Sequence, residues 1–300
     1  MSFFNTAIVT TLPFVPKPIV AQFAKKYIAG ETLSDAVATV RQLNSVQAMT
    51  TIDALGEDVV TQEQAIVHRD QSIAVLNTIA EQKIDSNLSV KLTSFGLKID
   101  KDFCRENFEA ILAVAASHKI FVRIDMEDHT CTDDTLALYR TLRVKYPNIG
   151  VVIQSYLHRS EDDVKKLASE NANVRMVKGI YKEPASVAIH SRREIQQNFV
   201  RLTKILLEAQ CYVAIATHDE TLFDASNQII RDMKLSAHQY EYQMLLGVRE
   251  ERRNRLIKEG HRMRIYTPYG KDWFGYSVRR LKENPHMAGH VFKAMFGIGQ

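Results

Sequence analysis

The 300-residue sequence has only 3 cysteines and lacks several patterns that define protein classes. Cys104, Cys131 and Cys211 are widely spaced and form no CxxC pair, which argues against a disulfide framework and against a cysteine zinc site. No stretch has the roughly 18 apolar residues that a membrane-spanning helix needs. Residues 1–16 lack the basic start of a signal peptide and contain prolines. We therefore expect a reduced, cytoplasmic protein.

The sequence also lacks a large excess of either basic or acidic residues. The chain has 39 basic and 35 acidic side chains, for a net charge of +4, and they are evenly spread. A dedicated nucleic-acid-binding protein normally concentrates its basic residues in one patch, so we expect no nucleic-acid partner. With 45% hydrophobic and 25% charged residues, the composition is that of an ordinary globular protein.

Eight short runs of apolar or β-branched residues recur along the chain and predict strands. The runs are Met49–Ala54, Leu88–Leu92, Ile120–Asp125, Gly150–Gln154, Val174–Lys178, Cys211–Ala216, Tyr240–Leu245 and Met263–Tyr266. Segments with helical periodicity separate them. One apolar stripe is formed by Cys104, Phe108, Ile111 and Ala115, and another by Ile195, Phe199, Leu202 and Leu206. Ser160 with Asp163 resembles a capping box that opens a further helix.

This alternation favours an α/β fold with a parallel sheet, and eight repeats favour a (β/α)₈ barrel of the TIM type. A doubly wound sheet is the rival fold. It more often carries a glycine-rich phosphate loop, and neither GxGxxG nor GxxxxGK[ST] occurs in the sequence. Pro18–Tyr27 and Leu33–Val46 resemble additional helices. We predict an N-terminal helical arm over residues 1–47 and one barrel domain over residues 48–300.

Polar residues stand at or near the carboxyl ends of several predicted strands. They are Lys91, Asp125, Gln154, Arg175, Lys178, Thr217, His218 and Tyr266. A single polar residue at a strand end is usually a capping residue. Barrel enzymes, however, build their active sites at the carboxyl ends of the strands. The repetition therefore predicts one active site at this rim.

Two alternatives use the same rim. The acidic segment Asp125–His129, together with His218–Glu220, offers the oxygen and imidazole ligands of a metal-dependent barrel enzyme. Lys91 and Arg175 argue against that site because they bring cations to the same place. The other alternative is a non-catalytic barrel that serves as a binding or scaffolding protein.

The predicted final helix has two distinct faces. Tyr276, Arg279, Arg280 and Glu283 share one face, and Phe274, Val278 and Leu281 share another that could pack on the barrel. The polar face is either an exposed surface of ion pairs or a pair of guanidinium groups that clamps a carboxylate. Because the helix follows the last strand directly, it can lean over the barrel mouth.

Taken together, these segments resemble the proline dehydrogenases, in the family's order. The similar segments are Ser89–Ser94, Val122–Asp128, Val174–Tyr181, Ala216–Asp219, Arg264–Gly270 and Trp273–Asn284. The resemblance is to the short, monofunctional bacterial form. It implies an FAD-containing barrel that oxidises L-proline to Δ¹-pyrroline-5-carboxylate, the first step of proline degradation to glutamate, and passes the electrons to a membrane quinone. It also implies transient contact with the inner face of the membrane and a separate pyrroline-5-carboxylate dehydrogenase downstream.

The resemblance also implies roles for individual residues, and it implies no metal. The catalytic residues would be Asp125, Arg175, Tyr266 and Tyr276, with Arg175 near the flavin N5. Substrate would be bound by Lys91, Arg279, Arg280, Leu245 and Glu283. The flavin would be contacted by Met126, Gln154, Arg175, Lys178, Gly179, Ile180, Tyr181, Thr217 and His218. Two positions depart from the family's pattern: Ile180 stands where many members have alanine, and Lys182 replaces a tryptophan of the fused forms.

Overall fold

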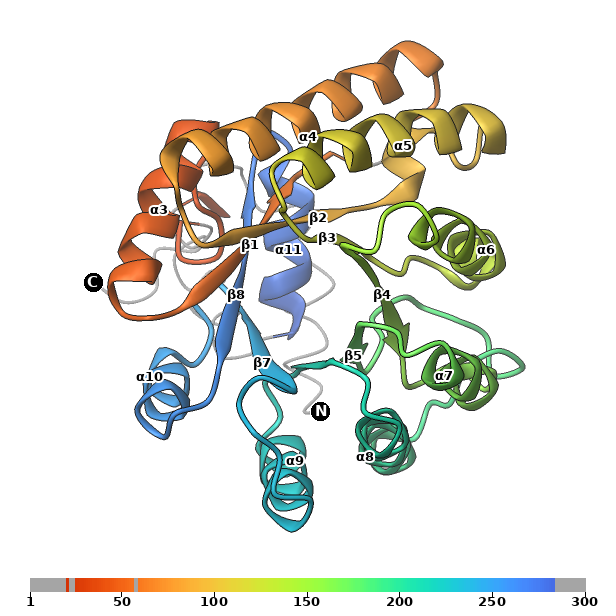
Figure 1. Cartoon of the computed structure of the whole chain (residues 1–300), viewed down its shortest axis with the longest axis vertical. Helices are drawn as coiled ribbons and strands as arrows, with labels where there is room; N and C mark the ends of the chain where they lie inside the picture. The colour runs from red at the N-terminus through yellow and green to blue at the C-terminus, as the bar shows by residue number, and fades with distance from the viewer. Residues whose placement is uncertain (1–19, 22–24, 57–58, 284–300) are drawn as a thin grey trace, which may run out of the picture.

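Eight parallel strands close into a barrel in chain order, with β8 paired to β1 (Figure 1). The computed structural model describes residues 20–21, 25–56 and 59–283, and of residues 279–283 only the backbone. The strands are β1 Met49–Ala54, β2 Ser86–Val90, β3 Val122–Ile124, β4 Ile149–Gln154, β5 Val174–Val177, β6 Val213–Ala216, β7 Tyr240–Leu245 and β8 Met263–Tyr269. The predicted (β/α)₈ barrel is confirmed and the doubly wound sheet is excluded.

Apart from the last one, which crosses the centre of the view, the helices surround the ring of strands (Figure 1). They are α3 Leu33–Ser45, α4 Gln62–Gln82, α5 Lys101–Ser117, α6 Thr132–Arg143, α7 Ser160–Ser169, α8 Arg192–Glu208, α9 Glu220–Asp232, α10 Glu250–Lys258 and α11 Trp273–Glu283. The two predicted apolar stripes lie on α5 and α8 and are buried against the barrel, apart from the partly exposed Ile195. Within the described residues, no helix has the length and apolar character needed to cross a membrane.

Helix α3 belongs to the predicted N-terminal arm and corresponds to the predicted helix Leu33–Val46. Its N-terminus is fixed by a reciprocal capping box, in which Asp35 N donates to Thr32 Oγ1 (3.2 Å) and Thr32 N donates to Asp35 Oδ2 (2.9 Å). Its buried face packs into the hydrophobic core of the barrel. Five of the ten residues of Pro18–Tyr27 lie outside the described residues, and the boundary at residue 47 stays a prediction.

The limits of the other strands differ from the predicted ones by at most two residues, and two further local predictions were wrong. Strand β8 does not end at Tyr266; it continues to Tyr269 because it stays paired with β1 along its full length. Ser160 with Asp163 does not form a capping box. The Ser160 hydroxyl donates instead to Gln154 O (2.6 Å), Asp163 pairs with Arg159, and no side chain caps α7.

Charged side chains fill the barrel interior near the amino-terminal ends of the strands. Arg264 Nε donates to both carboxylate oxygens of Glu241, at 2.9 and 3.1 Å. Arg123 Nη1 donates to the carbonyl oxygens of Asn173 (2.8 Å) and Val151 (3.0 Å). Because burying unpaired charges is costly, these bonds allow polar groups to occupy the core below the site.

Candidate active site

The carboxyl ends of the strands surround a cavity of about 1080 Å³. Its lining includes these residues singled out from the sequence: Lys91, Asp125, Met126, Gln154, Arg175, Lys178, Gly179, Ile180, Tyr181, Thr217, His218, Leu245, Tyr266 and Tyr276. Arg279, Arg280 and Glu283 lie on α11, and their side chains are outside the description. Tyr276 lines the cavity from α11, which crosses the centre of the strand ring in Figure 1. The structure therefore brings together residues from distant parts of the sequence.

Asp125 is held at the end of β3 by bonds to both its backbone and its side chain. Its backbone N–H donates to Val90 O (2.8 Å). Its Oδ1 accepts from Arg175 Nη1 (2.6 Å) and from Ser89 Oγ (2.9 Å). The side chain of Arg175 is only 6% exposed, so this charge-assisted bond is largely shielded from water. The carboxylate therefore has a fixed orientation toward the cavity.

A second carboxylate, Asp53 on β1, was missed by the sequence analysis. Its Oδ2 accepts from Tyr266 Oη (2.6 Å) and from Lys91 Nζ (3.0 Å), and its Oδ1 accepts from the same ammonium at 3.2 Å. The only sequence signal was an acidic residue inside a run that otherwise has the composition of a buried strand. Asp53, Lys91, Tyr266 and Asp125 thus form one connected network.

Burial sets the protonation behaviour of this network. It raises the pKa of Asp53, while the nearby Lys91 ammonium acts in the opposite direction. It also raises the pKa of Tyr266 well above the ordinary value, and the carboxylates of Asp125 and Asp53 raise it further. Tyr266 therefore keeps its phenolic hydrogen across the ordinary pH range.

Arg175 has hydrogen-bonding capacity left over. Its Nε and Nη2 are buried, and neither makes a hydrogen bond to any residue of the described part of the chain. Its guanidinium carbon lies 5.6 Å from the centre of the Tyr266 ring. Because a buried N–H donor without a partner is costly, these two nitrogens would be stabilised by a hydrogen-bond acceptor on a bound ligand.

The cavity wall beside Arg175 is built largely from fixed backbone and paired side chains. Gln154 Nε2 donates to Glu127 O (2.8 Å), and Leu245 N donates to His218 Nε2 (2.9 Å). Gly179 has a φ of +113°, and a Cβ there would lie 2.2 Å from Tyr156 Cδ1. Only glycine can therefore follow this path without displacing the ring.

Cations gather around one carboxylate at the outer rim. Asp219 Oδ2 accepts from Gln196 Nε2 (2.8 Å), Arg192 Nη2 (3.3 Å) and Lys178 Nζ (3.4 Å). The side chain of Lys178 is 41% exposed and that of Arg192 is 80% exposed. Both line the cavity, so they are accessible to an anionic ligand.

The metal-site alternative finds no support in this geometry. Among the described residues, no group of three or more His, Cys, Asp and Glu side chains converges on a point that could hold a metal ion. Glu127 is bonded to Thr93, and His129 to Glu183. His218 Nε2 uses its lone pair to accept from Leu245 N.

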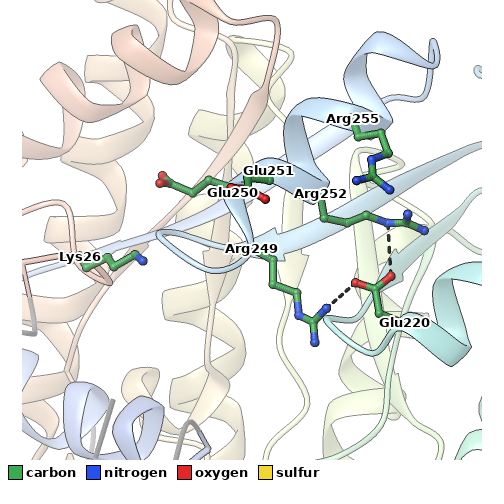
Figure 2. Close-up of a pocket in the computed structure, with 7 residues that line it drawn as sticks. All are labelled: Lys26, Glu220, Arg249, Glu250, Glu251, Arg252 and Arg255. Atoms are coloured by element: carbon green, nitrogen blue, oxygen red, sulfur yellow. Dashed lines mark hydrogen bonds and ion pairs between the residues drawn. The ribbon is translucent and has the colours of Figure 1, made fainter. Parts of the chain in front are cut away.

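A smaller pocket of about 460 Å³ lies beside the amino-terminal ends of α9 and α10 (Figure 2). Glu220 pairs there with Arg249 and with Arg252, as Figure 2 shows. Arg252 also pairs with Asp224. Of the two pockets, only the larger one is lined by Lys91, Asp125, Arg175 and Tyr266, so we assign the active site to the larger cavity.

The fold and the cavity define the class of protein first. A closed parallel barrel with buried cation–carboxylate pairs at the carboxyl ends of its strands is a barrel enzyme built for a small charged ligand. The family model "Proline dehydrogenase" matches residues 36–293. The chain therefore belongs to the proline dehydrogenase family.

Individual relatives agree with this assignment. The chain is 40% identical to Proline dehydrogenase 1 of Bacillus subtilis over 272 residues, which cover 91% of this chain and 90% of the relative. It is 35% identical over 277 residues to Proline dehydrogenase of Deinococcus radiodurans, covering 91% and 89%.

A solved structure supports the fold alone. Proline utilization A (PutA) from Bdellovibrio bacteriovorus, inactivated by N-propargylglycine, superimposes with a TM-score of 0.83 at 24% identity. The match covers 88% of this chain and 33% of that much longer one. At this identity the comparison supports the barrel and does not assign residue roles.

Proposed function

We propose that the protein is an FAD-dependent proline dehydrogenase that oxidises L-proline to Δ¹-pyrroline-5-carboxylate and passes the electrons to a quinone. The observation that carries the proposal is Arg175, which Asp125 fixes through one nitrogen while two others stay buried with no partner among the described residues. A buried cation in this position would stabilise negative charge that develops on a ligand in the cavity. This reaction is the first step of proline degradation to glutamate.

The cavity fits a flavin as well as an amino acid. At about 1080 Å³ it lies just above the roughly 300–1,000 Å³ that is typical of pockets for drug-sized ligands, which is far more than proline needs. The proposed flavin contacts are Met126, Gln154, Arg175, Lys178, Gly179, Ile180, Tyr181, Thr217 and His218. The bound FAD supplies the hydride acceptor, and the protein supplies orientation and charge.

The remaining cavity wall suits a small zwitterion. Lys91, together with Arg279 and Arg280 of α11, is proposed to bind the carboxylate, with Glu283 holding the arginines. Asp125 provides a negative charge for the amine. Loss of a hydride from the ring carbon beside nitrogen requires the amine lone pair, so the bound amine must lose its proton before oxidation.

Apolar and aromatic side chains complete the proposed substrate site. Leu245, Tyr266 and Tyr276 line the same cavity and are proposed to enclose the ring of proline. Their packing would hold the reacting carbon in one orientation, which is a large part of what an enzyme contributes to such a step.

The proposal includes partners beyond the substrate. A membrane quinone would take the electrons, which requires at least transient contact with the inner face of the membrane. A separate pyrroline-5-carboxylate dehydrogenase would consume the product. No nucleic acid is involved.

An anaerobic titration of the FAD-loaded protein with L-proline tests the function directly. We expect the flavin absorbance to bleach with L-proline and to return when a soluble quinone is added. Cyclopentanecarboxylate is the matched control, because it carries the carboxylate and the ring but no amine, and it should bind without bleaching. A protein that cannot be loaded with FAD, or whose flavin stays oxidised with L-proline, would refute the proposal.

A further inference from the structure

Asp53 belongs to the active-site network although it does not line the cavity. It lies inside β1 and is 2% exposed. Its carboxylate accepts from two groups that do line the cavity, the ammonium of Lys91 at 3.0 and 3.2 Å and the hydroxyl of Tyr266 at 2.6 Å. It is therefore placed behind the site, where it can act only through these neighbours.

The hydroxyl of Tyr266 lies between two carboxylates. Its oxygen is 2.6 Å from Asp53 Oδ2 and 3.2 Å from Asp125 Oδ2. A phenol has one hydrogen and can donate it in one direction only. The shorter distance assigns that hydrogen to Asp53. Lys91 Nζ, 3.4 Å from the phenolic oxygen, donates from a third direction.

Among the described residues, the direction of the phenolic hydrogen leaves one oxygen of Asp125 without a donor. Asp125 Oδ1 already accepts from Arg175 and Ser89, whereas Oδ2 faces the oxygen of Tyr266, whose hydrogen points elsewhere. Lys91 Nζ is 3.9 Å from Oδ2, which is beyond hydrogen-bond distance. Since Asp125 lines the cavity, Oδ2 is an acceptor for a donor on a ligand.

We propose that Asp53 is a positioning residue of the proline dehydrogenase reaction: it takes the hydrogen of Tyr266 and so keeps Asp125 Oδ2 ready to accept from the substrate's amine. This inference rests on the proposed function. When Tyr266 donates its hydrogen to Asp53, Asp125 Oδ2 can accept a hydrogen from the ligand. When Tyr266 donates to Asp125 instead, that oxygen is already occupied. The effect is specific to a ligand that carries an amine.

The isosteric variant Asp53→Asn separates this role from a merely structural one. Asparagine keeps the shape but carries no charge, so the phenolic hydrogen turns toward the charged Asp125, which is then the stronger acceptor. Because a hydrogen bond to a charged group contributes about 1.5–3 kcal/mol, kcat/KM for L-proline should fall by at least about tenfold. The Kd of cyclopentanecarboxylate, which has no amine, should stay within about threefold of the wild-type value.

Thr51→Val is the matched control. Thr51 lies two residues before Asp53 on the same inward face of β1, is 1% exposed, and its hydroxyl makes no hydrogen bond among the described residues. We expect both readouts to stay at wild-type values in this variant. Equal weakening of L-proline turnover and cyclopentanecarboxylate binding in Asp53→Asn, or no change in either, would overturn the inference.

The double variant Asp53→Asn/Tyr266→Phe tests whether Asp53 acts through Tyr266. Phenylalanine has no hydroxyl hydrogen that the Asp53→Asn substitution could turn toward Asp125. Adding Asp53→Asn to Tyr266→Phe should therefore lower kcat/KM by less than about threefold. Losses that multiply would contradict the inference. If Asp53→Asn does not fold, Asp53→Ser is judged by the same comparison. A wild-type protein that does not oxidise L-proline defeats the proposed function instead.

Discussion

Arg175 Nη1 lies 2.6 Å from Asp125 Oδ1, and this contact joins the interior of β5 to the end of β3 across the intervening strand β4. One guanidinium nitrogen fixes the carboxylate, while two others are buried without a hydrogen-bond partner among the described residues. A planar guanidinium can do both because its donors point in different fixed directions. The ion pair thus orders both the proposed amine site and the proposed flavin site.

Arg175→Lys should therefore separate charge from geometry. A lysine ammonium can pair with Asp125, but it cannot also present two nitrogens in the fixed geometry of arginine. We expect a folded protein whose flavin is reduced by L-proline at least about tenfold more slowly in anaerobic stopped-flow measurements. The exposed Arg201→Lys on α8 is the control and should match wild type. An unchanged rate in Arg175→Lys would mean that charge alone suffices.

Gly179→Ala should damage the loop that follows β5. The substitution combines a φ of +113°, which is unfavourable for alanine, with a Cβ 2.2 Å from the Tyr156 ring. Gly260→Ala provides the comparison, since φ is +86° there but no atom of the described residues lies within 4 Å of the added carbon. We expect Gly260→Ala to cost about 1 kcal/mol in urea unfolding, and Gly179→Ala to cost more and to retain less FAD after gel filtration. Equal effects of the two substitutions would argue against the steric explanation.

The eight strands could be predicted because strands of a parallel barrel are buried on both faces and have almost continuous apolar runs. The rim residues then followed from the rule that barrel active sites lie at the carboxyl ends of strands. The residues at which strands end were harder to predict from the sequence. Strand β8 runs through Pro268, which cannot donate to a neighbour but whose carbonyl accepts from Ala29 N (2.8 Å).

Asp53 could not be assigned from the sequence for a different reason. Whether an acidic residue in a buried strand meets a partner depends on the register of neighbouring strands and on the tertiary direction of its side chain. Here β1 pairs with β8 so that Thr51 is opposite Tyr266 and Asp53 is opposite Pro268, and the long side chain of Tyr266 reaches Asp53 two residues further along. That relationship joins residues far apart in the chain. The roles of Arg279, Arg280 and Glu283 stay predictions, since the structure describes only their backbone.

Glu241 should make the stability of the protein depend on acid pH. Burial by itself would raise the pKa of Glu241, but the ion pair and hydrogen bond with Arg264 outweigh it, so the pKa lies below the ordinary value. A carboxyl with a lowered folded-state pKa stabilises the fold above its unfolded pKa of about 4.3. That stabilisation is lost as pH falls through the folded-state value.

Urea unfolding of Glu241→Gln across the acid range checks this dependence. At neutral pH the variant should be less stable by about 3–5 kcal/mol, because Arg264 keeps a buried charge without its partner. Its free energy of unfolding should then fall less steeply than that of wild type as the pH decreases from about 5 to 3. Parallel curves for the two proteins would show that Glu241 is not a source of the acid sensitivity.

Lys91→Met should destabilise the protein because it removes a buried positive charge from the active-site network. The side chains of Lys91 and Asp53 are 14% and 3% exposed, and their ion pair lies beside a second carboxylate, Asp125. Removing the ammonium leaves two nearby carboxyl groups with fewer positive partners, and breaking a buried pair on one side typically costs about 3–5 kcal/mol. We therefore expect a large loss in the free energy of unfolding at neutral pH, measured by urea titration.

Removing the unpaired charge should restore part of that loss. In the double variant Lys91→Met/Asp53→Asn the buried carboxylate is neutral, so the free energy of unfolding should be higher than in Lys91→Met alone, although both positions are now changed. The affinity for L-proline should remain low in both variants, because neither retains the ammonium proposed to bind its carboxylate. If instead the two substitutions destabilise additively, the contact between Lys91 and Asp53 contributes no net coupling to the fold.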